Sequence, residues 1–415
     1  MACRVSRDSA MNNAVASPAP VRLFAVATAV IVLSLYQAQP LIGMMTRSLH
    51  LTPAVAGLIS TLTLLGYACG LFLLVPLCDV CENRSLVLAT LFANALTLLL
   101  AACPIPAAAF LVASGLTGFT ATAIQMLIPM AAAMVPEAQR GRVIGNVMSG
   151  LILGVLLSRP LASVVAGRFG WRMSYWVLAA AVGVLTLLLA KMLPRRSPPH
   201  AGRYVALLSS MAGLLREEPV LRRRAFAAAL CFAAFNAFWS TVVLRLSSAP
   251  FGLSADGVAI YALVGVSGAL AAPFAGRLGD RGFDRIGTHA ARMAVVLAMA
   301  LAWIGGVLTT HLSPALSLSL LVMAAILLDA GTIADQALGR RAVNLLRPEA
   351  RGRINALFTG IFFMGGALGS ALAGVVWARA GWHGVCLEAI AFAVAALVYG
   401  MRRHSTAVLL ATEDS

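Results

Sequence analysis

Residues 143–167 read VIGNVMSGLILGVLLSRPLASVVAG, an apolar stretch that contains a single charge, Arg159. An α-helix rises about 1.5 Å per residue, so about 20 such residues cross the roughly 30 Å hydrocarbon core of a bilayer. A charge inside that core costs roughly 2.5–3.5 kcal/mol on insertion scales, and residues that carry this cost commonly serve function. Arg159 is therefore a candidate binding residue. The structural alternative is an arginine that pairs with a helix carbonyl or snorkels to an interface.

The rest of the chain has the same character, because 60% of its 415 residues are hydrophobic and only 11% are charged. Its apolar segments are about twice the length of a barrel strand and lack the alternation of apolar and polar residues in such a strand, so helices are expected rather than a β-barrel. The sequence predicts an all-α membrane protein. Its twelve expected transmembrane helices lie at about 23–45, 54–77, 85–103, 107–134, 143–167, 173–193, 225–247, 256–275, 290–310, 314–337, 354–378 and 382–401.

The net charge of +16 is explained by topology. With both termini in the cytoplasm, 25 of the 31 Lys and Arg residues fall on the inner side, and five (Arg47, Arg168, Arg172, Arg245 and Arg379) fall on the outer side. The positive-inside rule therefore predicts a multi-pass membrane protein with cytoplasmic N and C termini, and it removes the nucleic-acid interpretation of the charge.

Targeting and metal signals are weak. The stretch from Met1 to Val21 is polar and the first apolar run is too long for the core of a cleaved signal, so we expect an uncleaved anchor. The seven cysteines are scattered and indicate no disulfide framework. Cys78 and Cys81 form one isolated CxxC without a second ligand pair. We expect no metal site, no cofactor and a monomeric protein in the lipid bilayer.

The chain reads as two copies of one unit. Four landmarks recur at offsets of 201–212 residues: PEAQRGR at 136–142 and PEARGR at 348–353, Gly170-Trp171 and Gly381-Trp382, the helix-opening hydroxyls Thr52 and Ser254, and Asp79 and Asp280. The expected organisation is a tail (1–22), a six-helix half (23–193), a linker with a short amphipathic helix (194–224), a second six-helix half (225–401) and a tail (402–415). Parallel repeats of this kind are the plan of rocking secondary transporters, with the substrate site between the halves.

One loop carries a family signature. Residues 276–282 read GRLGDRG, which resembles the Gly-x-x-x-Asp-Arg-x-Gly loop of the major facilitator superfamily as far as Asp280 and Arg281. The first-half copy at 75–84 keeps Asp79 and a following Arg84 but lacks the leading glycine. Further motifs are similar to a bacterial branch of arabinose-efflux-like and drug-efflux-like permeases: YxxQPL at 36–41 and GYxxG at 66–70. The resemblance covers residues 20–401 and implies a twelve-helix transporter.

The resemblance also implies a gate at the cytoplasmic helix ends, where charge pairs hold one face closed and separate when it opens. The gating residues expected from it are Asp79, Arg84, Arg142, Gly276, Asp280, Arg281 and Arg353. Because the second-half loop is better preserved, Asp280→Asn is expected to weaken closure more than Asp79→Asn. The alternative is that these charges serve only as topology determinants.

Several intramembrane polar side chains are candidate substrate ligands beside Arg159. Gln39 precedes Pro40, and Gln125 is followed by Pro129, so each amide can serve a ligand or satisfy a carbonyl that proline frees. Asn236 and Trp239 combine an amide with an aromatic wall, as in mostly apolar ligand cavities, although packing alone also explains the aromatics.

Asp329 is the deepest acid and the expected proton-coupling residue, because desolvation favours the protonated carboxyl group. Asp335 is expected to form a capping salt bridge near Arg340 and Arg341, and Glu388 to reach the outer interface. By helix rise, Arg159 lies roughly 24 Å outward from the inner end of its span and Asp329 roughly 22 Å inward from the outer end. These different depths predict two separate charges and not a static ion pair.

Together these features predict a secondary transporter that works by alternating access and exports a small organic molecule (drug, sugar or metabolite) in exchange for protons. Proton-coupled uptake of a metabolite is the first alternative. A non-transporting sensor or scaffold is the second, and it would tolerate apolar residues at both Arg159 and Asp329. No GxxxxGK[ST] loop for ATP occurs, and no catalytic cluster indicates an enzyme.

Overall fold

The computed structural model describes residues 18–195 and 204–401 apart from 266, 267, 269, 270, 272, 273, 279, 280, 310, 348 and 349. Within these residues every regular element is helical, as predicted. The helices are α2 (Pro18–Tyr36), η1 (Gln39–Leu41), α3 (Ile42–Ser48), α4 (Pro53–Leu73), η2 (Val75–Asp79), α5 (Asn83–Ala102), α6 (Ala107–Ala121), α7 (Ala123–Ala133), α8 (Glu137–Phe169), α9 (Trp171–Met192), α10 (Tyr204–Glu217), α11 (Pro219–Leu246), α12 (Ala255–Ala262), η3 (Leu263–Gly265), α14 (Asp284–Val307), α15 (Pro314–Asn344) and α16 (Arg351–Met401).

Ten helical segments of the described chain are long and apolar enough to cross a membrane. The longest, α16, has 51 residues and is interrupted at Gly381, where φ is 58°, so it supplies the eleventh and twelfth expected spans. The eighth expected span begins with α12 and η3 and includes helical residues 274–278. The N-caps predicted for two spans are confirmed, since Thr52 and Ser254 accept hydrogen bonds from the amides of Val55 and Gly257.

Two spans are broken near their middle. The first span consists of α2, the short 3-10 turn η1 around Pro40, and α3. The fourth span is divided into α6 and α7 at Thr122. The break at Pro40 places Gln39, which is 1% exposed, at the centre of the helix packing. Such irregular backbone is tolerated at membrane depth where protein surrounds it.

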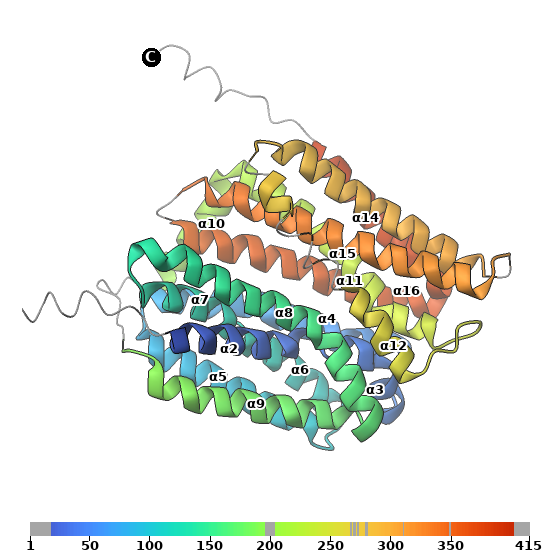
Figure 1. Ribbon diagram of the computed structural model, residues 1–415, viewed down its shortest axis with the longest axis horizontal. Coiled ribbons are helices and arrows are strands. Elements are labelled where there is room, and N and C mark those ends of the chain that lie inside the picture. Colours follow the sequence, from blue (N-terminus) through green and yellow to red (C-terminus); the bar gives the residue numbers. More distant parts are fainter. Residues whose placement is uncertain are drawn as a thin grey trace, which may run out of the picture.

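The helices form two groups, α2–α9 and α11–α16. Figure 1 shows the first group in its lower part and the second in its upper part, except that α12 of the second group lies lower, beside α8. The same contact recurs in both groups. Methyl groups added at Gly150 and Gly154 of α8 would lie 2.2 and 2.3 Å from the carbonyl oxygens of Ala25 and Ala29 of α2. Methyl groups at Gly365 and Gly369 of α16 would each lie 2.1 Å from those of Ala229 and Ala233 of α11. Small residues at this spacing let helix backbones approach closely.

The two groups meet along two seams. Helix α4 packs against α16, and α8 packs against α12. Outside the bundle, large apolar side chains such as Phe92, Leu187 and Val398 are more than half exposed. A soluble protein rarely exposes so many apolar side chains, whereas lipid tails solvate them.

The connecting helix α10 contacts both groups. The Tyr204 hydroxyl donates to the carbonyl oxygen of Leu73 at the end of α4 (2.8 Å), and Arg353 of α16 donates to the Ser210 hydroxyl (2.8 Å). Met211 and Leu214 form the buried face of α10, which fits the amphipathic helix expected between the halves.

Candidate functional site

Arg159 lies near the centre of the molecule and is 3% exposed. It belongs to α8, a 33-residue helix that continues through Pro160. Its Nε donates a hydrogen bond to Oε1 of Gln39 at 3.0 Å. The interruption of the first span at η1 is therefore what brings an amide within reach of the guanidinium.

Gln39 in turn connects the two helix groups. Its Nε2 donates to Oδ1 of Asn236 in α11 at 3.0 Å, and Asn236 Nδ2 donates to the carbonyl oxygen of Phe232 at 2.9 Å. The hydrogen-bonded series Arg159, Gln39 and Asn236 thus spans α8, η1 and α11. Three of the five predicted substrate ligands are brought together by it.

Aromatic rings enclose the guanidinium. The Arg159 Cζ atom lies 4.2 Å from the ring centroid of Trp239, 5.4 Å from that of Phe235 and 5.6 Å from that of Tyr36. Cation–π contacts of this kind stabilise a desolvated arginine by roughly 2 kcal/mol or more. The aromatic residues offset part of the cost of burying the charge.

Asp329 approaches the same indole from α15. Trp239 Nε1 donates to Asp329 Oδ1 at 2.8 Å. A methyl group added at Gly265 would lie 3.0 Å from Asp329 Oδ2 and 3.4 Å from an Nη1 of Arg159, so the two charges flank one glycine. The different depths predicted for Arg159 and Asp329 are therefore wrong. Both helices extend beyond their apolar cores, so counting from the ends of those cores misplaces the charges along the membrane normal.

The guanidinium has hydrogen-bonding capacity to spare. Its Nη2 is buried without a hydrogen-bond partner. Beside it lies a small cavity lined by Gln39, Pro40, Arg159, Trp239, Val243, Val258, Tyr261 and Ala262. A buried unpaired donor of a charged group is costly, so an acceptor that reaches this nitrogen would stabilise the site.

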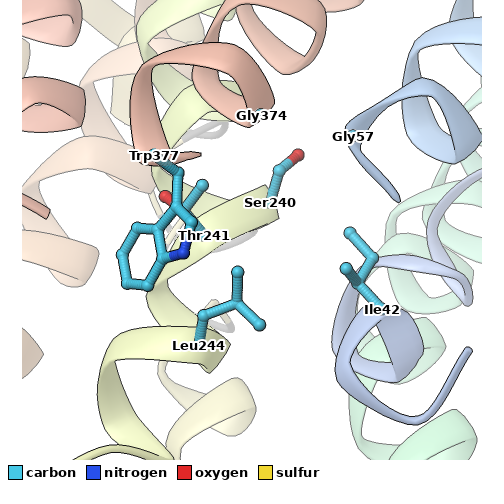
Figure 2. Close-up of a pocket in the computed structure, with 7 residues that line it drawn as sticks. All are labelled: Ile42, Gly57, Ser240, Thr241, Leu244, Gly374 and Trp377. Carbon is cyan, nitrogen blue, oxygen red and sulfur yellow. The ribbon is translucent and has the colours of Figure 1, made fainter. Parts of the chain in front are cut away.

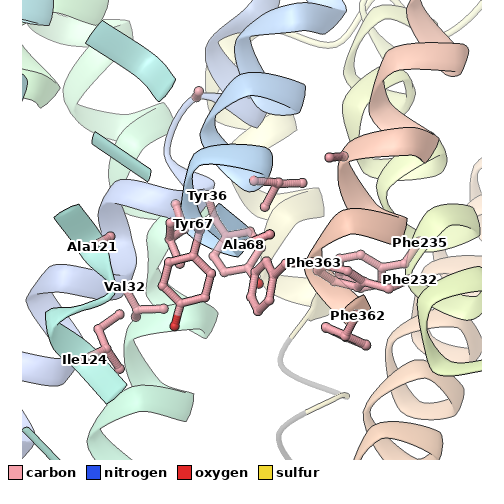
Figure 3. Packing of buried hydrophobic residues seen from close by; sticks show 14 of the residues in the cluster. Val32, Tyr36, Tyr67, Ala68, Ala121, Ile124, Phe232, Phe235, Phe362 and Phe363 are labelled. Atoms are coloured by element: carbon pink, nitrogen blue, oxygen red, sulfur yellow. The ribbon is translucent and has the colours of Figure 1, made fainter. Parts of the chain in front are cut away.

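A second polar layer involves Gln125, whose Nε2 donates to the Tyr67 hydroxyl at 3.3 Å. Arg340 of α15 interacts electrostatically with Tyr67, across the boundary between the groups. Gln125 therefore does not join the Arg159 series. Aromatic rings near this layer include Tyr67 against Phe363 (4.5 Å between centroids) and Phe232 stacked on Phe362 (3.9 Å), as seen in Figure 3.

Another cavity opens between the groups at the α4–α16 seam. Figure 2 shows its lining by Ile42 and Gly57 from one group and by Ser240, Thr241, Leu244, Gly374 and Trp377 from the other. This lining carries no charge, and the hydroxyls of Ser240 and Ser370 bond each other at 3.0 Å nearby. The charged chemistry thus lies with the cavity beside Arg159.

The structure places the predicted gating residues as follows. Arg353 of α16 interacts electrostatically with Asp79 at the end of η2. Arg84 donates to the carbonyl oxygen of Ala190 at 2.7 Å. Arg142 and Arg281 are exposed. A methyl group at Gly276 would meet no atom within 4 Å, and Asp280 lies outside the described residues.

Asp335 forms a salt bridge, but its predicted partners were wrong. Arg292 Nε of α14 contacts Asp335 Oδ1 at 2.8 Å with both side chains 2% exposed, while Arg341 pairs with Asp284 at 2.8 Å. The helical spacing of Asp335 gives its face but not which neighbouring helix covers that face. Glu388 does not reach the interface freely, since both of its carboxylate oxygens are buried without a hydrogen-bond partner.

Gly265, Tyr261 and Arg292 were not singled out from the sequence. Gly265 lies between the two charges, and Tyr261 donates to the carbonyl oxygen of Leu321 at 2.8 Å while lining the cavity. Arg292 lies two residues inside the expected ninth span and, like Arg159, is an arginine within an apolar run. That signal could have identified it.

Two groups of membrane-spanning helices related by a repeat, with a buried polar site at their boundary, define a membrane transporter rather than an enzyme. The sequence profile of the Major Facilitator Superfamily matches residues 24–338, and the chain belongs to this family.

Named relatives agree with this assignment. The chain is 32% identical over 386 residues to the uncharacterized transporter YgaY of Escherichia coli O157:H7, covering 93% of this chain and 96% of the relative. It is 32% identical over 373 residues to the probable transporter SCO4007 of Streptomyces coelicolor, covering 90% and 84%. A crystal structure of a mutant nucleoside transporter NupG superposes with a TM-score of 0.72 at 18% identity, covering 92% of this chain and 99% of that chain. The structural likeness supports the fold.

Proposed function

We propose that this protein moves a small organic molecule across the bacterial inner membrane by alternating access, coupled to protons. One observation supports this above the others: Arg159 and Asp329, of opposite charge, contact the same buried indole of Trp239. The site lies where the two helix groups meet, so rocking of the groups can expose it to each side in turn. A sensor or scaffold gains nothing from burying two charges at this cost.

In this proposal Arg159, Gln39, Asn236 and Trp239 bind the substrate, and Gln125 contributes from the second layer on the same boundary. Asp329 takes up and releases the proton. Asp79, Arg84, Arg142, Gly276, Asp280, Arg281 and Arg353 act at the cytoplasmic gate. The termini lie in the cytoplasm, the two six-helix halves move as units about the 194–224 linker, and the protein works as a monomer.

The direction of transport has two candidates. Export in exchange for protons follows from the resemblance to efflux permeases. Uptake together with protons is the second candidate, and a specific observation favours it: the guanidinium of Arg159 has an unpartnered Nη2, and its Nη1 and the Oδ2 of Asp329 flank the same glycine, Gly265. A ligand that satisfies this nitrogen gains when Asp329 is neutral, so ligand and proton would bind together.

Purified protein in proteoliposomes tests the proposal. With a radiolabelled panel of metabolites and drugs, an imposed pH gradient should drive accumulation of at least one solute by the wild type. Asp329→Asn mimics the protonated carboxyl group, so it should lose gradient-driven accumulation and still equilibrate the same solute down its own gradient. Glu388→Gln removes a second acid within the helices, whose carboxylate oxygens have no hydrogen-bond partner, and serves as the matched control, which should keep coupling.

Coupling that persists in Asp329→Asn and disappears in Glu388→Gln would move the proton site to α16. Full accumulation in both variants would place the proton site at another residue, and a wild type that only equilibrates the solute would be a uniporter. If no solute responds to the gradient in the wild type, the proposal of proton coupling fails.

A further inference from the structure

The charges at the boundary between the helix groups do not balance. Among the described residues at the two polar layers, Arg159 and Arg340 are cations and Asp329 is the facing carboxylate. Asp335 and Arg292, on the adjoining helices α15 and α14, neutralise each other. A desolvated charge requires a partner of opposite sign to be tolerated, so the boundary as a whole favours one further negative charge.

The geometry also specifies the shape of the missing partner. The planar guanidinium fork suits a carboxylate, which can accept two parallel hydrogen bonds. In Arg159 the Nε is held by Gln39, whereas Nη2 is buried and unpartnered. The adjoining cavity is walled by apolar groups, among them Pro40, Val243, Val258 and Ala262. Such a cavity suits an apolar body attached to the carboxylate.

Asp329 decides when that carboxylate can bind. Its Oδ1 accepts from Trp239, while Oδ2 faces Gly265 and the guanidinium. The other titratable groups that interact electrostatically with it are the hydroxyls of Tyr36 in α2 and Tyr261 in α12. While Oδ2 is ionised, it repels a second carboxylate at short range and partly neutralises Arg159.

We propose that the substrate is a small monocarboxylate with an apolar body, and that it binds Arg159 when Asp329 has taken up a proton. This inference rests on the proposed function and names its substrate class. Water on the entry side supplies the proton to Oδ2, and the carboxylate then restores the neutrality of the site. On the other side the carboxylate leaves and Oδ2 returns the proton to water. One anion and one proton therefore cross together, and an inward proton gradient drives uptake.

A matched set of probes separates charge from shape. Benzoate, benzamide and benzamidine have nearly the same size and carry negative, zero and positive charge, and phenylacetate, butyrate and lactate extend the set of carboxylates. Thermal unfolding and titration calorimetry of the purified protein measure binding at about pH 6 and pH 8. We expect a carboxylate to bind more tightly than its neutral and cationic counterparts. Its affinity should fall up to roughly tenfold per pH unit above the titration of Asp329, because one proton is taken up with it.

Variants locate both groups. Arg159→Gln should lose carboxylate binding, whereas Arg168→Gln, an exposed arginine of the same helix, should keep it. Asp329→Asn should bind the carboxylate without pH dependence and without proton uptake, measured by calorimetry in buffers of different ionisation enthalpy. If Asp329→Asn does not fold, the proton uptake of the wild type decides the question.

Binding of none of the four carboxylates, or tighter binding of benzamidine, overturns the substrate class. Carboxylate binding without proton uptake overturns the co-transport. These failures are distinguishable from failure of the proposed function, because gradient-driven transport of a neutral or cationic solute in proteoliposomes would remain.

Discussion

Two equivalent positions of the repeat carry very different side chains. Gly150 and Gly154 pack on the backbone of α2, and Gly365 and Gly369 pack in the same way on the backbone of α11. At the 211-residue offset of Gly170-Trp171 and Gly381-Trp382, the position of Arg159 corresponds to Ser370 in the second half. Ser370 lies against Gly57 at the α4–α16 seam, while Arg159 lies beside Gly265 and Asp329 at the α8–α12 seam.

The two halves share their helix packing but differ in their polar residues. In both halves small residues hold two helices together; we call these two glycine contacts, α8 on α2 and α16 on α11, the frame. At the α4–α16 seam, a methyl group on Gly57 would lie 3.0 Å from the carbonyl oxygen of Ser370, and the contact is one of backbone packing. At the α8–α12 seam the same position carries the charge, and we infer that only this seam binds substrate.

The largest effect is expected from breaking the frame itself. Gly150→Ala and Gly365→Ala each place a methyl group within 2.2 Å of a carbonyl oxygen of the neighbouring helix. Each should therefore destabilise the protein by about 1–3 kcal/mol or prevent folding. Thermal unfolding in detergent measures this. Gly145→Ala is the control, because its methyl group would meet no atom within 4 Å. Unequal losses in the two halves would show that the frames are not equivalent.

Removing the charge that distinguishes the seams should affect transport. Arg159→Ala should lower transport roughly 10- to 100-fold, since a hydrogen bond to a charged group contributes about 1.5–3 kcal/mol. Arg159→Lys keeps the charge but loses the planar fork, so it should also be impaired. Uptake into vesicles is the measurement and Arg168→Ala the control. Wild-type transport by both Arg159 variants would end the assignment.

A smaller effect is expected at the proposed gate, in the loops that carry Asp79 and Asp280. Asp280→Asn should increase access to the central site more than Asp79→Asn, because the second-half loop retains Arg281 and Gly282. Labelling of Gln125→Cys by an impermeant maleimide in a cysteine-free background measures access. Exposed charge pairs contribute about 0.2–1 kcal/mol, so changes of up to roughly fivefold are expected. Equal or reversed effects would contradict the difference between the loops.

The smallest effect is expected at α10. Tyr204→Phe removes one exposed hydrogen bond to Leu73, which water replaces in part, so the cost should be about 0.5 kcal/mol or less and the same maleimide labelling should rise no more than roughly twofold. Ser209→Ala is the control, because the Ser209 hydroxyl bonds only within α10, to the carbonyl oxygen of Ala206. An increase with Ser209→Ala equal to that with Tyr204→Phe would show that the contact with α4 is not responsible.

The spans and their caps could be predicted because they depend on local patterns: apolar length, and hydroxyls at Thr52 and Ser254. The convergence of Arg159, Gln39 and Asn236 could also be predicted, since polar side chains within a membrane tend to pair with one another. The relative depth of Arg159 and Asp329 could not be predicted. Helix α15 has 31 residues and α8 has 33, so each exceeds the bilayer and its register cannot be counted from the sequence.

The partners of charged residues were harder still to predict. The spacing of Asp335 identifies a helix face, but Arg292 comes from a helix about 40 residues earlier, and only tertiary packing brings it there. Gly265 gives no signal in the sequence because its function is the absence of a side chain between two charges.

The bonds of α10 to Leu73 and Arg353 have a thermodynamic consequence for the gate. A connection attached to both helix groups turns their closure into an intramolecular association, with a high effective concentration of one face for the other. Individually weak contacts would then suffice to hold the proposed gate shut, and equally weak perturbations would release it. Replacing this helix by a long flexible linker would lower that effective concentration without altering any contact in the substrate site.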